Sequence, residues 1–195
     1  MKSIFAAGIT AMALGFAGTA AADDDAAPYY IHLEKAGLEL IEYSGGGSLP
    51  VRDVVDADAW QGRFGIQLNE NFAVEAGYSQ SKDNVGGEGQ SFGLLMIRSG
   101  ADGATTLPFS EIPVNVYANF GKSFGDVNLR DGTRRDLNGF AAGVGVGFQF
   151  TPNFEVAIDW TTYGEDDNLS GGTIDGYRLS GFSLGLRVGL GGGED

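Results

Sequence analysis

Apolar residues alternate with polar or very small residues over most of the chain. From Trp60 to Leu68 nearly every second residue is apolar, and most of the intervening residues are Gln, Arg or Gly. No long run places apolar residues at the spacing of a helix face. Because successive side chains of a strand point to opposite faces, this alternation predicts strands that are apolar on one face and polar on the other.

Eight alternating segments, separated by turn residues, are predicted as strands. Over most of them the apolar side chains occupy even-numbered positions, including Phe92, Leu94 and Met96. The first segment changes phase between Leu33 and Leu38, which predicts a β-bulge there. The eight segments are Tyr29–Tyr43, Ala59–Leu68, Phe72–Ser81, Gln90–Ile97, Ile112–Phe124, Leu137–Phe150, Phe154–Gly164 and Tyr177–Leu190.

Two three-residue links, Asn69–Asn71 and Thr151–Asn153, are suited to tight hairpins and so fix the strand register. The link between Arg98 and Glu111 is much longer. The predicted register places Gly65 opposite Glu75 in the first hairpin and Gly145 opposite Asp159 in the second.

The polar face is too poor in charge for a water-exposed surface. It consists mainly of Gly, Ala, Asn and Gln, and three alternate glycines in one strand leave room for large neighbours inside a narrow barrel. We therefore expect the apolar face to meet lipid and the polar face to line the lumen. The few charges on the polar face have compensating signs and are predicted to form a lumen network of Arg63, Glu75, Glu155, Asp159 and Arg187.

Aromatic residues form two bands near opposite strand ends, as in the girdles at membrane interfaces. One band comprises Phe72, Phe148, Phe150 and Phe154, and the other Trp60, Tyr78, Phe92, Phe124 and Phe140. Every peptide group in hydrocarbon needs a hydrogen-bond partner, so a spanning sheet has to close. The predicted fold is all-β: an eight-stranded antiparallel up-and-down transmembrane β-barrel.

The chain begins with the pattern of a secretory signal. Lys2 precedes the apolar run Ile4–Phe16, and Ala20–Ala22 supplies small residues before an acidic start. This divides the 195 residues into a signal peptide (1–22) and a barrel domain (23–195). The net charge of -14 argues against a nucleic-acid surface, and clusters of acidic residues fall in predicted loops.

Three stretches resemble OmpA-like eight-stranded outer-membrane barrels, a superfamily of porin-family β-barrel proteins. Gly65–Tyr78 is similar to the second hairpin, Phe140–Trp160 to the sixth and seventh strands, and Tyr177–Leu190 to the closing strand. The resemblance implies a small barrel in the outer membrane of a Gram-negative cell, surrounded by lipid and lipopolysaccharide. It also implies a monomer inserted by the outer-membrane assembly machinery.

The sequence predicts no catalytic, cofactor or metal site. His32 is the only histidine, which excludes a histidine-cluster metal site, and no GxSxG motif supplies a nucleophile. His32 is interpreted as a polar lumen residue. The acidic lumen residues are likewise interpreted as charge partners of arginine rather than as catalytic carboxylates.

Lys122 and Arg178 occupy even positions near the outer ends of their strands. There a cation can extend to the headgroups and contact lipopolysaccharide phosphates. An ordinary charge at the barrel rim is the alternative interpretation.

The expected function is structural: a barrel that supports envelope integrity and has acidic extracellular loops available for contacts. A narrow passive channel for small solutes is the main alternative, and a lipid-modifying enzyme is a third. Eight strands enclose a lumen that side chains largely fill, which favours the first function.

We predict that the signal segment is cleaved after Ala22, so that the mature protein begins at Asp23. The intact mass of protein purified from cell envelopes measures this directly. A mass that still includes residues 1–22 would contradict the prediction.

Overall fold

The computed structural model describes residues 29–44, 51–69, 71–81, 90–107, 110–129, 132–166 and 176–190. The predicted signal segment lies outside this part of the chain. All of the regular elements within it are strands. Accordingly, these residues include no helix that is long and apolar enough to cross a membrane.

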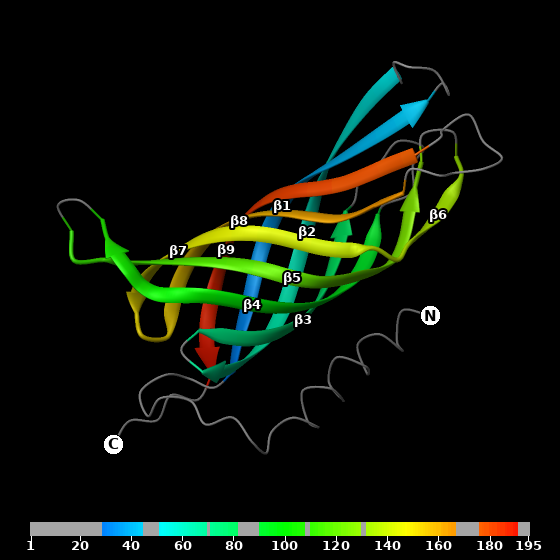
Figure 1. Ribbon diagram of the computed structural model, residues 1–195. Coiled ribbons are helices and arrows are strands. Elements are labelled where there is room, and N and C mark those ends of the chain that lie inside the picture. Colours follow the sequence, from blue (N-terminus) through cyan, green and yellow to red (C-terminus); the bar gives the residue numbers. More distant parts are fainter. Residues whose placement is uncertain are drawn as a thin grey trace.

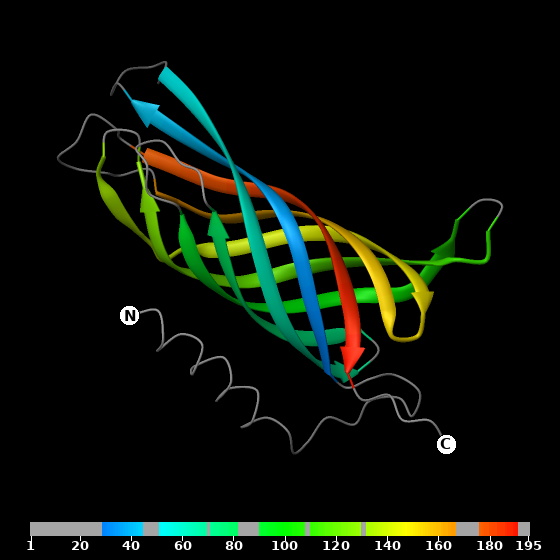
Figure 2. The ribbon, with the colours of Figure 1, turned by 180° about the vertical axis from the view of Figure 1, so that it is seen from behind.

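Nine antiparallel strands form one closed sheet (Figures 1 and 2). Eight of them make the barrel wall in sequence order, β1 pairing with β9 and β4 with β5 to complete the circle. The short β6 extends the wall beside the end of β5. The strands are β1 (Tyr29–Ser44), β2 (Val51–Asn69), β3 (Phe72–Ser81), β4 (Ser91–Thr106), β5 (Pro113–Asn128), β6 (Arg134–Leu137), β7 (Phe140–Thr151), β8 (Phe154–Asp166) and β9 (Gly176–Leu190).

The closed eight-stranded barrel confirms the predicted fold class. We call the end with the Asn69–Asn71 and Thr151–Asn153 links the turn end, and the opposite end the loop end. Both hairpin registers are confirmed, because Gly65 pairs with Glu75 and Gly145 with Asp159. Each ladder shifts by one residue only next to its turn.

Several predicted strand limits are wrong. β2 begins eight residues earlier than expected, at Val51, and the predicted segment Leu137–Phe150 is divided between β6 and β7. β4 continues to Thr106, so most of the long link after Arg98 is strand. Beyond Ser99, β4 pairs only with β5, and this two-stranded hairpin projects past its neighbours at the turn end (Figure 1).

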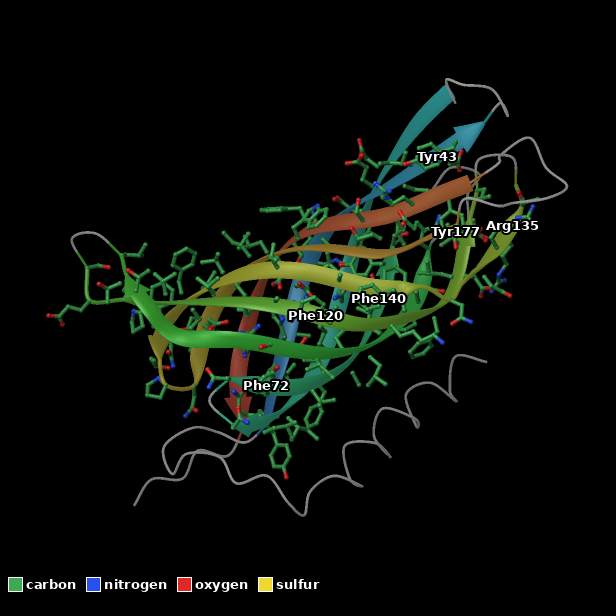
Figure 3. The ribbon with its side chains drawn as sticks, viewed as in Figure 1. Tyr43, Phe72, Phe120, Arg135, Phe140 and Tyr177 are labelled. Atoms are coloured by element: carbon green, nitrogen blue, oxygen red, sulfur yellow. The ribbon has the colours of Figure 1, made fainter. Side chains whose placement is uncertain are left out.

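The outer wall is apolar. Large hydrophobic side chains that are 38% to 68% exposed come from every barrel strand. Figure 3 labels three of them, Phe72 near the turn end, Phe120 on the wall, and Phe140 nearer the loop end. An exposed apolar surface that encircles the molecule is what contact with lipid requires.

The predicted phase of β4 is wrong. Leu95 and Ile97 face outward, whereas Phe92, Leu94 and Met96 are 1% exposed and point into the barrel. In the ladder, odd residues of β4 pair with even residues of β3 and β5. In β4, both even- and odd-numbered positions carry apolar residues. The sequence pattern therefore does not show which face points inward, and packing inside the barrel decides it.

The predicted bulge in β1 is also wrong, because β1 pairs with β2 and β9 without any register shift. Leu38 and Leu40 instead point inward together with Ala36. The phase of the apolar pattern changes because the lumen itself changes from polar to apolar along the strand.

The loop half of the lumen is filled by an apolar cluster. Its residues come from every strand except β3, and Phe92 packs against Tyr163 with ring centroids 4.9 Å apart. The loop-half cluster consists of Ala36, Leu38, Leu40, Ala59, Phe92, Leu94, Met96, Val127, Leu129, Leu137, Ala141, Tyr163, Tyr177 and Leu179.

Leu94 and Leu95 form a matched pair that tests which face of β4 is inside. We expect Leu94→Ala to lower the free energy of unfolding by about 2–5 kcal/mol, because it leaves a cavity in packed protein. Leu95→Ala should cost only about 1–2 kcal/mol, because lipid fills the space that the side chain vacates. Urea unfolding of the barrel measures both values. An equal or larger loss at Leu95 would contradict the inward placement of Leu94.

Candidate functional site

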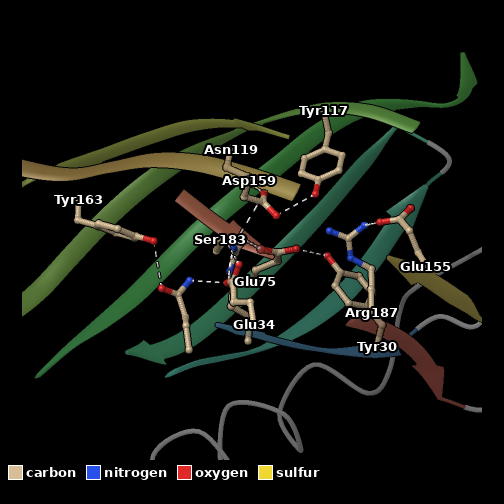
Figure 4. A network of polar contacts seen from close by, with 12 residues as sticks. Tyr30, Glu34, Glu75, Tyr117, Asn119, Glu155, Asp159, Tyr163, Ser183 and Arg187 are labelled. Atoms are coloured by element: carbon tan, nitrogen blue, oxygen red, sulfur yellow. Dashed lines mark hydrogen bonds and ion pairs between the residues drawn. The ribbon is translucent and has the colours of Figure 1, made fainter. Parts of the chain in front are cut away.

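The turn half of the lumen holds a network of buried polar side chains (Figure 4). The predicted lumen charges Arg63, Glu75, Glu155, Asp159 and Arg187 all point into it and are at most 6% exposed. They lie on β2, β3, β8 and β9. The alternation of the strands thus brings side chains distant in sequence into one enclosed space.

Arg63 is the centre of the network. Its Nε and Nη2 contact Glu34 Oε1 at 2.6 and 2.5 Å, and its Nη1 lies 2.9 Å from Glu75 Oε2. Nη2 is also 3.9 Å from Asp159 Oδ1. One guanidinium therefore serves three carboxylates from three strands, which fits its five donors and delocalised charge.

Glu34 is held by further donors. Gln61 Nε2 donates to Glu34 Oε1 at 2.7 Å, and the Ser183 hydroxyl donates to Oε2. Gln61 in turn accepts a hydrogen bond from the Tyr163 hydroxyl at 3.2 Å. Since Tyr163 belongs to the loop-half cluster, this bond links the polar and apolar halves of the lumen.

Glycines make space for the aromatic members of the network. The Tyr30 ring lies over Gly65, where an added Cβ would be 2.1 Å from Tyr30 Cζ, and its hydroxyl donates to Glu75 Oε1 at 2.6 Å. The Tyr117 ring covers Gly145 in the same way. A glycine on one strand therefore leaves space for an aromatic ring from a neighbouring strand, as expected for a narrow lumen.

Asp159 and Glu155 each have partners on β5. Tyr117 donates to Asp159 Oδ2 at 3.0 Å and Asn119 to Oδ1 at 3.2 Å. Asn115 donates to Glu155, which also forms an ion pair with Arg187. These contacts tie the two carboxylates of β8 to β5, which lies on the far side of β7.

Two guanidinium groups stack on tyrosine rings near the turn end. Arg98 lies over the Tyr117 ring at 4.5 Å, and Arg187 lies 5.0 Å from the same ring and 5.2 Å from that of Tyr30. In the turn half the three arginines face four carboxylates, Glu34, Glu75, Glu155 and Asp159, so the buried charges compensate to within one unit.

Sequence reasoning missed Tyr30, Glu34 and Arg98. An unbroken phase in β1 would have placed Tyr30, His32 and Glu34 on one face, so the signal was present but was hidden by the supposed bulge. Arg98 was assigned to a connection, and nothing in the ambiguous sequence of β4 would have placed it inside.

His32 is fully buried in the lumen, and neither ring nitrogen has a hydrogen-bond partner in the described structure. It therefore forms no serine–histidine pair there. His32, Glu34 and Asp159 have potential ligand atoms within 4.8 Å of one another. However, the Arg63 guanidinium already contacts Glu34 and lies near Asp159, which puts a positive charge beside the position that a metal ion would need.

The two predicted headgroup contacts, Lys122 and Arg178, are exposed on the outer wall toward the loop end. Arg178 forms an exposed ion pair with Glu165 at 2.7 Å. Lys122 pairs in register with Phe140 of β7. Both cations thus lie outside the lumen network.

A closed sheet with an apolar outer wall and an interior that holds buried charges defines a transmembrane β-barrel of the outer-membrane class. The chain belongs to the outer membrane protein beta-barrel domain family, whose family model matches residues 8–190. Its location is therefore the outer membrane. No curated protein matches the sequence.

Several solved structures of outer-membrane barrels are similar to this chain. Neisserial surface protein A is 18% identical, with a TM-score of 0.49 and coverage of 84% of this chain and 97% of that one. The N-terminal barrel of OprF from Pseudomonas aeruginosa is 18% identical, with a TM-score of 0.46 and coverage of 81% and 96%. Ail, the attachment invasion locus protein of Yersinia pestis, is 16% identical, with a TM-score of 0.45 and coverage of 84% and 98%.

We predict that Arg63 and Glu75 are energetically coupled. Arg63→Gln should cost about 3–5 kcal/mol, because it leaves buried carboxylates uncompensated, and Glu75→Gln should cost less. The double variant should cost less than the sum of the two.

Urea unfolding of the four proteins gives the coupling energy. Arg134→Gln is the control, because its ion pair with Asp126 is exposed and should contribute about 1 kcal/mol or less. Strict additivity of Arg63→Gln and Glu75→Gln would count against the pairing.

Proposed function

We propose that this protein is a structural and interaction barrel of the outer membrane that conducts no solutes and catalyses no reaction. The observation that carries the proposal is that side chains fill the lumen. Paired charges fill its turn half, and an apolar cluster fills its loop half. The barrel would stabilise the envelope through its wall and offer its loop end for contacts.

The turn half of the lumen is obstructed by its paired charges. Arg63 joins carboxylates from three strands, and Arg187 joins Glu155 while lying against two tyrosine rings. Opening a path here requires separation of buried ion pairs, which is costly because buried charges then lose part of their compensation.

The loop half is obstructed in another way. Leu94, Leu179 and Tyr163 are at most 1% exposed and meet other apolar side chains inside the barrel. A hydrated ion or polar solute would have to shed water to pass among them, and apolar constrictions are known to close pores in this way.

The loop end supports the interaction role. Strand β2 continues past β3 toward the loop end, where its residues 51–58 pair with β1 (Figure 2). Its outward residues Asp56 and Asp58 are exposed, in keeping with the chain's net charge of -14. A partner that docks there would need a basic or otherwise cation-bearing surface.

We expect the mature protein to give no large, stable conductance steps in planar bilayers. A lumen of eight strands is about wide enough to be filled by side chains, whereas water-filled porins need roughly 16 strands. A 16-stranded porin in the same bilayers is the positive control. Reproducible steps of similar size from the pure monomer would favour the channel function instead.

A further inference from the structure

A hollow of about 470 Å³ lies on the outside of the barrel, where β8, β9, β1 and β2 approach the loop end. Aromatic rings from β8 and β9 line one part of it, and carboxylates from β1 and β2 line the other. We call it the acid–aromatic hollow and define it by Gly37, Glu39, Asp56, Asp58, Trp160 and Phe182. Its volume lies within the range of ligand sites, which is about 300–1,000 Å³.

The strand register places a ring and a carboxylate on either side of a glycine. Gly37 of β1 pairs with Phe182 of β9 on one side and with Asp58 of β2 on the other. Phe182 in turn pairs with Trp160 of β8. Because neighbouring strands are about 4.8 Å apart, β9 and β2 are roughly 10 Å apart, with only a glycine between them on the outer face. This spacing leaves a slot for one flat group between the ring and the carboxylate.

The space over Gly37 is open. A Cβ added there would have only the Phe182 carbonyl oxygen within 4 Å, at 3.9 Å. At Gly65 and Gly145, by contrast, an added Cβ would collide with a tyrosine ring of the lumen. The lumen glycines thus leave space that the chain itself fills, whereas Gly37 leaves a slot on the outer surface.

The hollow lies where the apolar wall ends. In the next register row toward the loop end, four strands carry hydroxyl or carboxylate groups, namely Thr162, Ser180, Glu39 and Asp56. Ionised carboxylates need water or a cationic partner, so this row marks the polar side of the membrane boundary. Lys35 lies 3.2 Å from Asp58, but both groups are more than half exposed, so their ion pair is weak and open to exchange.

A guanidinium is the group that can use both sides of the slot. Its flat face stacks on an aromatic ring, and its N–H groups donate to a carboxylate, often two at a time. The Phe182 and Trp160 rings are 58% and 51% exposed and so are accessible to such a cation. A divalent metal ion would engage only the carboxylates, and an acyl chain only the rings. The combination of groups therefore favours arginine.

We propose that the acid–aromatic hollow binds an arginine side chain of a partner protein that docks at the loop end. The guanidinium lies over Gly37, between the Phe182 ring and the Asp58 carboxylate. Neighbouring basic residues of the partner meet Glu39 and Asp56. The proposal names the partner chemistry for the interaction role described above and rests on that role.

The test uses the Trp60→Phe protein in phosphatidylcholine nanodiscs, where Trp160 is the single tryptophan and reports on the hollow. The probe is a capped peptide with two arginines separated by glycine, and matched peptides carry lysine or citrulline instead. The arginine peptide should change the Trp160 emission saturably. The lysine peptide should need a concentration about fivefold higher, and the uncharged citrulline peptide should give no saturable change.

A glycine substitution tests the slot without changing any charge. Gly37→Val should fill the slot and raise the half-saturating concentration of the arginine peptide about tenfold or more. The matched control is Gly62→Val on β2, outside the hollow, where an added Cβ would meet only the Leu33 side chain at 3.5 Å. The control should bind the peptide as the parent does.

Charge variants test the carboxylate side. Asp58→Asn should raise the half-saturating concentration about fivefold, because the guanidinium loses its acceptor. Lys35→Met should lower it about twofold, because Asp58 loses a competing cation. Asp126→Asn is the control, since Asp126 pairs with Arg134 on another part of the loop end and should have little effect.

Heat-dependent gel mobility checks the folding of every variant, and only folded protein is titrated. Unchanged binding by Gly37→Val would overturn the proposal, and so would equal losses at Asp58→Asn and Asp126→Asn. An equal response to the lysine peptide would also overturn it, because charge alone would then explain the binding. Loss of the peptide site leaves the conductance result unchanged, and porin-sized conductance leaves the peptide titration unchanged, so the two proposals fail separately.

Discussion

In the hydrocarbon core of a membrane, an unpaired peptide group has no water to bind, and each one costs several kcal/mol. The sheet of this protein meets that constraint by closing, with β1 against β9 and β4 against β5. Closure pairs both edges of the sheet and separates an outer from an inner face. The other features of the molecule follow from these two faces: apolar side chains cover the outer face, and packed side chains fill the lumen.

The narrow interior admits few charges, and those it admits must be compensated. Arg63 contributes to this compensation for three carboxylates, because the strand register brings them within reach of one guanidinium. Glycines are part of the same solution, since Gly65 and Gly145 leave the volume that two tyrosine rings occupy. Electrostatic pairing and steric fit therefore depend on each other in this half of the barrel.

The sequence was sufficient for the strand number, the two short hairpin registers and the inward placement of residues such as Glu75 and Asp159. Period-2 alternation and short turns are local signals, and they persist in the folded barrel. β4 could not be oriented in this way, because apolar residues at both parities leave the face to be decided by packing with Tyr163. Glu34 was missed because the inward apolar residues Leu38 and Leu40 on the same face of β1 changed the phase of the pattern, which was interpreted as a bulge.

The loop-half cluster has an electrical consequence. A bilayer is an insulator because its interior cannot stabilise a separated charge. Here Leu38, Leu94 and Leu179 place a medium of similar polarizability inside the barrel. The interior of the loop half thus has a low dielectric constant, in contrast to the turn half with its paired charges.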